Sequence, residues 1–258
     1  MSPAARCLLV LGTHRSGTSI TTALVQALGF ELGGPLLHVG DENPLGHFEH
    51  VEVLNTQDRY LHDLGLEWFQ PVDPWQLAGE TRRRQWCDEM TDLYASITDG
   101  AEQFAIKDPR LVRFLPLWWA VFRRLKVRAT AMVTLRDPQS TASSLARRNQ
   151  MAAADAERLW CYDMESIRRN IGRCPHGIVR YEDLVTDPVV TMRRGFARAG
   201  LQWQPSAEPQ IRQLVDPGLD RSHAGGGATV PMAAARYREI LGCSTVGAWR
   251  ALAADVLS

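Results

Sequence analysis

Short apolar runs alternate with amphipathic segments along this chain. Four of the runs predict buried strands, at residues 6–12, 104–106, 129–135 and 177–181. Apolar residues recur at helical spacing in 18–28, 51–64 and 189–199, and a more polar helix is expected around 78–98. Strands that alternate with helices in this way predict a layered α/β fold with a mainly parallel sheet.

An Asp-Pro pair closely follows three of the predicted strands. Asp is a favourable helix N-cap, and Pro is tolerated at the first helical position. We therefore expect each pair to mark the point where the chain leaves a strand and enters a helix, as parallel βαβ units require. The three pairs are Asp108-Pro109, Asp137-Pro138 and Asp187-Pro188.

The composition is that of an ordinary globular protein. Of 258 residues, 45% are hydrophobic and 22% are charged, which excludes intrinsic disorder. The 29 basic and 29 acidic residues balance, which argues against a nucleic-acid partner. The apolar runs are far shorter than the ~20 residues of a membrane span. The five cysteines are dispersed without a C-x-x-C pair, so we expect reduced thiols and a cytoplasmic location.

The strongest chemical signal is the segment Gly12–Ser19, GTHRSGTS, between the first predicted strand and the first predicted helix. This position presents backbone N–H groups at a helix N-terminus, where anions bind. The spacing resembles a Walker A loop, but Thr18 stands where an NTPase has its lysine. The segment therefore favours a phosphate-type ligand near Arg15 over metal-assisted γ-phosphoryl transfer. A plain Gly-rich turn is the alternative.

Two further strand ends carry cations. Arg136 ends the third strand, and Ser144 lies about two helical turns later, so the two could hold a second phosphate. Lys107 and Arg110 follow the second strand, at the edge where ligands bind in open parallel sheets. The alternatives are a surface salt bridge for Arg136 and a carboxylate partner for Lys107.

Together these residues resemble the sulfotransferase superfamily that uses 3′-phosphoadenosine 5′-phosphosulfate (PAPS). The loop resembles the 5′-phosphosulfate loop of its bacterial members, and Arg136 with Ser144 resembles the 3′-phosphate site. Three other segments resemble family elements: Asn43–Glu49 (NPLGHFE), Lys107-Asp108-Pro109 and Tyr181–Leu184 (YEDL) with Asp187-Pro188.

The resemblance implies a P-loop-like three-layer fold, with a mainly parallel sheet of about four to five strands and helices on both faces. It implies one domain over 1–258, with a PAPS-binding core at about 7–200 and a C-terminal helical segment at 201–258. The chain lacks the R-K-G loop of cytosolic members, and Arg221–Gly227 is a candidate replacement.

The resemblance also implies PAPS as the sulfuryl donor, PAP as the released product, and no metal. Arg15 and Lys107 would act as charge clamps, and His14 would be a structural residue or an adenylate contact. The implied cofactor-binding residues are His14, Arg15, Ser16, Gly17, Thr18, Ser19, Arg136 and Ser144.

An acceptor hydroxyl needs a general base within hydrogen-bonding reach. Glu49 is favoured and Glu42 is next, with Asp41 and His47 as further candidates. The acceptor would be a small molecule, a glycan or a glycosylated natural product, and segments 33–75 and 150–170 are expected to shape its pocket. The protein would be a monomer or homodimer. The rival hypotheses are a Mg-ATP-dependent small-molecule kinase and a non-catalytic nucleotide-binding protein.

Overall fold

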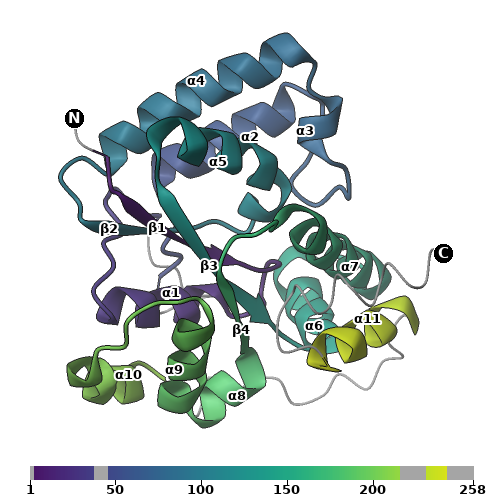
Figure 1. Ribbon diagram of the computed structural model, residues 1–258. Coiled ribbons are helices and arrows are strands. Elements are labelled where there is room, and N and C mark those ends of the chain that lie inside the picture. The colour runs from purple at the N-terminus through teal and green to yellow at the C-terminus, as the bar shows by residue number, and fades with distance from the viewer. Residues whose placement is uncertain (1–2, 38–45, 216–230, 243–258) are drawn as a thin grey trace.

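The computed structural model describes residues 3–37, 46–215 and 231–242. Its sheet contains four parallel strands in the order β2-β1-β3-β4 (Figure 1). The strands are β1 (Arg6–Leu11), β2 (Gln103–Lys107), β3 (Arg128–Leu135) and β4 (His176–Arg180). Each of the four predicted strands is found within a few residues of its expected place, and the α/β prediction is confirmed.

Helices follow and separate the strands in chain order. The predicted helices near 18–28, 51–64, 78–98 and 189–199 correspond to α1, α2, α4 and α9. The elements are α1 (Thr18–Ala27), α2 (Val51–His62), α3 (Pro74–Leu77), α4 (Glu80–Ile97), α5 (Leu111–Leu125), α6 (Pro138–Asn149), α7 (Ala153–Asn170), α8 (Tyr181–Thr186), α9 (Pro188–Arg198), the 3-10 turn η1 (Pro205–Ala207), α10 (Glu208–Leu214) and α11 (Pro231–Gly242).

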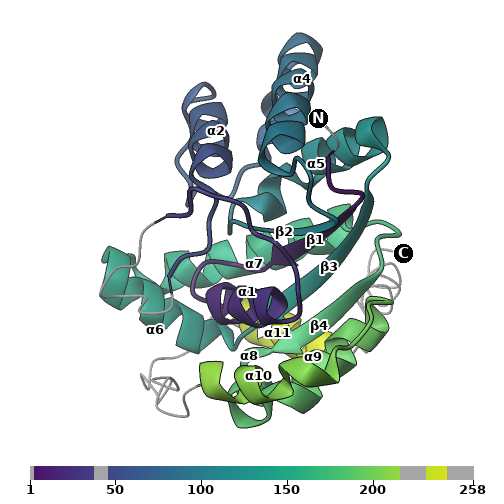
Figure 2. The same ribbon diagram turned by 90° about the vertical axis from the view of Figure 1, so that its left-hand side faces the viewer.

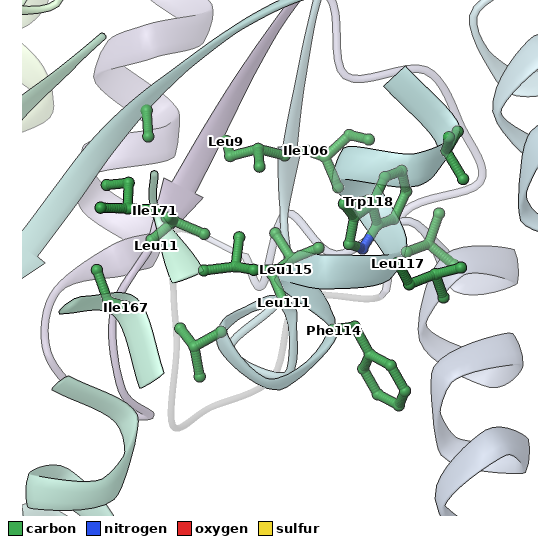
Figure 3. Packing of buried hydrophobic residues seen from close by; sticks show 14 of the residues in the cluster. Leu9, Leu11, Ile106, Leu111, Phe114, Leu115, Leu117, Trp118, Ile167 and Ile171 are labelled. Atoms are coloured by element: carbon green, nitrogen blue, oxygen red, sulfur yellow. The ribbon is translucent and has the colours of Figure 1, made fainter. Parts of the chain in front are cut away.

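Both faces of the sheet are buried, which explains why its strands are continuous apolar runs. Leu9 and Leu11 point to one face, where α5 and α7 pack on them (Figure 3). Leu8 and Val10 point to the opposite face, toward α1 and α9. Figures 1 and 2 both show α2, α4 and α5 on one side of the sheet and α1, α8, α9 and α10 on the other.

The Asp-Pro prediction, a strand followed directly by an Asp-capped helix, is correct in full only at Asp137-Pro138. Asp137 and Asp187 are N-caps of α6 and α9, and each carboxylate accepts a backbone N–H from the first turn, but helix α8 lies between β4 and Asp187. Asp108 is different, because α5 begins at Leu111 after Arg110. The Asp108 carboxylate accepts bonds from Arg110 and from the Gln57 side chain, so it belongs to a buried polar network.

A proline inside α5 helps to join this helix to α7. Pro116 has no N–H, so it leaves the carbonyl of Val112 without its usual helical partner. The Ser166 hydroxyl of α7 donates to that carbonyl at 2.5 Å. The two helices therefore share a buried hydrogen bond in addition to their apolar contact.

Parallel strands place all their carboxyl ends at one edge of the sheet. The Gly12–Gly17 loop follows β1, Lys107 ends β2, Arg136 follows β3 and Tyr181 follows β4. The fold thus brings the expected site segments to a common edge. Within the described residues, no helix has the length and apolar character that a membrane span requires.

Candidate functional site

The Gly12–Gly17 loop is shaped by two close approaches that only glycine allows. A Cβ at Gly12 would lie 2.1 Å from Thr134 Oγ1, and a Cβ at Gly17 would lie 2.5 Å from the Tyr181 ring. Gly17 also has a φ of 95° and forms the N-cap of α1 without a side-chain cap. The first N–H groups of α1 therefore have no side-chain acceptor at the cap, as an anion-binding helix terminus requires.

Ser16 stabilises the shape of this loop. Its hydroxyl donates to the Thr13 carbonyl at 2.7 Å and lies 2.9 Å from Thr134 Oγ1, while its backbone N–H donates to Thr13 at 3.3 Å. Thr18 is buried at the start of α1, and Ser19 is half-buried beside it. The Ser16 side chain is thus directed into the protein.

Arg15, Arg136 and Ser144 come together although more than 120 residues separate the first from the others. Arg15 Nε donates to Ser144 Oγ at 3.0 Å, and Arg136 Nη1 donates to the Arg15 carbonyl at 3.0 Å. The Arg136 guanidinium also stacks on the Tyr181 ring at 4.3 Å. Its Nε is buried and has no hydrogen-bond partner among the described residues. The two arginines that the sequence assigned to separate phosphates are therefore neighbours.

Lys107 and Glu49 form a buried ion pair. Their side chains are 3% and 9% exposed, and Lys107 Nζ lies 2.6 Å from Glu49 Oε1 and 2.8 Å from the His47 carbonyl. Burial raises the pKa of the Glu49 carboxyl, although Lys107 and Arg110 favour its charged form. The structure thus brings together the favoured base and the second predicted cation.

Further charges surround this pair. Arg110 Nη1 lies 3.9 Å from Glu49 Oε2, and Arg110 also pairs with Asp58 and Asp108. Gln57 donates to Asp108 and accepts from Trp118, which lies in the core. Each of these charged groups is held in place by a buried partner.

His14, within the loop, packs against the segment that follows α2. Its ring centroid is 4.5 Å from that of Trp68, with the planes tilted by 49°. Burial and the nearby charges of Arg110, Lys107 and Arg113 lower the pKa of His14 well below its ordinary value. The imidazole is therefore neutral at physiological pH.

The tryptophans divide between site and core. Trp68 contacts His14, whereas Trp75 lies against Arg83 of α4. Trp118 is completely buried, and Trp119 donates to the Asn170 carbonyl. Of the aromatic residues considered for acceptor stacking, Trp68 is the one beside the loop.

Sequence reasoning missed three polar residues behind the loop: Thr134, Arg113 and Asp163. Thr134 contacts Ser16, and Arg113 pairs with Asp163. The pattern of apolar residues in the sequence did contain a signal for the Arg113–Asp163 pair. Arg113 interrupts an apolar run, and Asp163 occupies the apolar face of α7 between Trp160 and Ile167. A charge in such a position requires a buried partner.

Several candidates lie outside the described residues. They are Asp41, Glu42, the first part of the 43–49 segment, and the Arg221–Gly227 replacement for the R-K-G loop. Among the residues that the structure does describe, no group of three His, Cys, Asp or Glu side chains could hold a metal ion.

Known proteins resemble this chain in sequence profile and in fold. The profile of the sulfotransferase family matches residues 8–205. The sulfotransferase domain of the Synechococcus PCC 7002 olefin synthase has a TM-score of 0.56 at 18% identity, covering 95% of this chain and 97% of that one. The sulfotransferase domain of the curacin biosynthetic pathway has a TM-score of 0.58 at 13% identity, covering 93% and 99%.

A third similar structure is a sulfotransferase from Mycobacterium tuberculosis, with a TM-score of 0.50 at 16% identity over 84% of this chain and 74% of that one. No curated protein matches the sequence. The structural similarities show the fold, and the profile match shows the family.

Proposed function

Because this chain belongs to the sulfotransferase family, we propose that it transfers a sulfuryl group from PAPS to an acceptor and releases PAP. The acceptor would carry a hydroxyl or amine on a small molecule, a glycan or a glycosylated natural product. The observation that carries the donor assignment is the junction of Arg15, Arg136 and Ser144 beside the N-terminus of α1.

The residues present match the chemistry of a bisphosphorylated nucleotide. The α1 terminus offers N–H groups to an anion, and the lack of a Cβ at Gly12 and Gly17 lets Thr134 and Tyr181 pack directly against the loop. Arg136 retains a buried Nε without a partner among the described residues, and Tyr181 holds its guanidinium flat. A phosphate oxygen would supply the missing acceptor.

PAPS would supply the sulfuryl group, and negative charge would develop on the phosphate oxygen that departs. The N–H groups of residues 17–19 and the Arg15 guanidinium would stabilise that charge. Arg15 stays protonated, so it acts through charge rather than by proton transfer. Lys107 would contribute a second positive charge from the end of β2.

Glu49 would accept the proton of the acceptor group. The pair with Lys107 orients the carboxylate, and its raised pKa makes it a stronger base than an exposed glutamate. Lys107 would then stabilise the neighbouring charges as the proton moves. His14 would line the route between donor loop and acceptor, with Trp68 as its stacking partner.

The described cysteines support a reducing compartment such as the cytoplasm. Cys7, Cys87, Cys161 and Cys174 are free thiols. Burial raises the pKa of each of these thiols, which makes them poorly reactive.

The test is calorimetric titration with PAP in EDTA, on the wild type and on Arg136→Ala. We expect wild-type binding that weakens by about 10- to 100-fold in the variant, because a charge-assisted hydrogen bond contributes about 1.5–3 kcal/mol. Arg84→Ala is the matched control, since Arg84 lies on α4 with an exposed side chain paired to Glu80. Arg136→Lys, checked for its melting temperature, separates loss of contacts from loss of fold.

Three outcomes would contradict the proposal. Equal affinity for adenosine 5′-phosphate and PAP would remove the 3′-phosphate assignment. Binding of ATP only after addition of Mg²⁺ would favour the kinase hypothesis. Tight PAP binding without sulfuryl transfer across a broad acceptor panel would favour a non-catalytic nucleotide-binding protein.

A further inference from the structure

A buried charged pair lies behind the Gly12–Gly17 loop. Arg113 of α5 and Asp163 of α7 each have a side chain that is 2% exposed, and Arg113 Nε lies 3.7 Å from Asp163 Oδ1. Placing two charges in the interior costs several kcal/mol per ion, and apolar replacements are often as stable or more stable. A contribution to stability therefore does not readily explain why this ion pair is present.

The pair contacts both of the segments that meet at His14. The Thr13 hydroxyl lies close enough to Asp163 to favour its charged form. On the other side, Arg113 Nη1 donates to the Gln70 carbonyl at 2.6 Å. Thr13 precedes His14 in the loop, and Gln70 follows Trp68 by two residues. The contact between His14 and Trp68 is thus flanked by contacts to the same ion pair.

Thr13, Arg113 and Asp163 form a buried cluster whose hydrogen bonding is incomplete among the described residues. Thr13 Oγ1, Asp163 Oδ1 and Arg113 Nη2 are buried without a well-formed hydrogen bond. Three orphaned polar atoms in one place are uncommon, because buried polar groups are almost always satisfied. A small movement of the loop toward Asp163 would let the Thr13 hydroxyl donate a hydrogen bond to the carboxylate.

The two helices that carry the pair are fixed to each other. Ser166 donates to the carbonyl that Pro116 leaves without a partner, one turn of α7 from Asp163 and one residue of α5 from Arg113. Arg113 also lies over the Tyr162 ring at 5.4 Å. The pair is therefore mounted on a rigid base, as a positioning group requires.

We propose that Arg113 and Asp163 are positioning residues that hold Thr13 and His14 of the donor loop against the Trp68–Gln70 segment. This proposal rests on the proposed function. Both side chains of the pair are almost completely buried, so they would act through the loop rather than by contact with donor or acceptor. The pair sets the distance between the loop proposed to bind the donor and the Trp68–Gln70 segment on the proposed acceptor side. This distance matters because a displacement of 1 Å at a reacting centre can reduce the rate by ~100-fold.

Asp163→Asn is the first test, with Asp88→Asn as the matched control. Asp88 lies on α4, outside the segments expected to shape the acceptor pocket, in an exposed ion pair with Arg124. We expect Asp163→Asn to lower kcat by about 10- to 100-fold and to raise the acceptor KM, while PAP affinity changes by less than about threefold. Asp88→Asn should match the wild type in all three.

A double variant separates positioning from stability. Arg113→Met with Asp163→Leu removes both charges and fills the space with apolar atoms, so its melting temperature should equal or exceed that of the wild type. We expect this folded variant to remain as slow as Asp163→Asn. Wild-type kcat in the double variant would overturn the proposal, because it would leave the pair with a structural role alone.

A measurement without turnover distinguishes this proposal from the proposed function. The imidazole ¹³C–¹H signals of the seven histidines can be recorded, and the His14 signal assigned with His14→Gln. Asp163→Asn should shift the His14 signal, and Asp88→Asn should not. An unchanged His14 signal in Asp163→Asn overturns the positioning role. Failure of the wild type to bind PAP or transfer sulfuryl overturns the proposed function and leaves the His14 result intact.

Discussion

The two sides of the candidate site use their cations differently. On the proposed donor side, Arg136 contacts a carbonyl and an aromatic ring, and no carboxylate among the described residues pairs with it. On the proposed acceptor side, Lys107 pairs with Glu49, and Arg110 pairs with Asp58 and Asp108. The donor side keeps capacity for an added anion, whereas the acceptor side is already neutralised and built to hold a carboxylate. Substitutions should therefore affect binding on one side and proton transfer or stability on the other.

The largest effect is expected at Glu49. Glu49→Gln removes the proton acceptor and should lower kcat by about 10²- to 10⁴-fold, the usual contribution of general-base catalysis. PAP affinity should stay within about threefold, because Glu49 lies on the acceptor side. Steady-state kinetics together with calorimetry measure both quantities, and Glu52→Gln is the exposed control. A parallel loss of PAP affinity and kcat would erase the division between the two sides.

The next effect is expected on stability at Lys107. Lys107→Met leaves the Glu49 carboxylate buried without its closest cation, so unfolding in urea should be easier by about 3–5 kcal/mol. The chain's other lysine, Lys126, is exposed, and Lys126→Met should change the free energy of unfolding by less than about 0.5 kcal/mol. Adding Glu49→Gln to Lys107→Met should restore much of the loss. A cost below ~1 kcal/mol would place the pair among surface salt bridges.

A smaller, pH-dependent effect is expected at Asp163, the buried carboxylate on the donor side. Burial raises the pKa of Asp163 to about 6, from an ordinary value near 4, although Arg113 opposes the shift. The folded state therefore binds this proton more tightly, and its contribution to stability is lost as pH rises from about 4 to 6. Asn does not titrate, so Asp163→Asn avoids this loss. Measured by urea unfolding, the free energy of unfolding of Asp163→Asn minus that of the wild type should increase by up to roughly 3 kcal/mol from pH 4 to pH 7. A pH-independent difference would show that Asp163 titrates as an exposed group.

The smallest effect is expected at Gly17. Gly17→Ala places a Cβ against the Tyr181 ring and strains a residue with positive φ, so PAP should bind about 10-fold more weakly. Gly100→Ala is the control, because Gly100 also has a positive φ but no atom within 4 Å of the added carbon. Equal PAP affinity in the two variants would mean that the contact between Gly17 and Tyr181 does not shape the donor side.

Much of the local structure on the proposed donor side could be predicted from the sequence, because it depends on local features. Glycines, a strand end and a helix start occur together within Gly12–Ser19, and Arg136 follows a recognisable strand. The four strands were predictable for the same reason, since each is a short apolar run beside a turn or cap. What the sequence did not show is that Arg15 and Ser144 would share a hydrogen bond.

The acceptor side was less predictable, because its partners come from distant segments. Lys107 and Glu49 are 58 residues apart, and their pairing depends on how the loop before α2 returns to the end of β2. Asp108 shows most clearly where prediction from the local sequence fails. Its sequence is that of a helix cap, but burial beside Gln57 and Arg110 draws the carboxylate into the network. The tertiary contacts of Asp108 therefore override its local preference for a helix N-cap.

The strand order has a consequence for how the donor loop is assembled. β1 is synthesised first, yet its partners β2 and β3 begin about 100 and 120 residues later. The loop that follows β1 needs Thr134 and Tyr181 to take its shape. The nascent chain therefore carries an incompletely shaped Gly12–Gly17 loop through most of its translation, and non-local pairing of this kind is slow. If this loop binds the donor as proposed, nucleotide binding would become available only once the fourth strand has docked, and it would report that folding is complete.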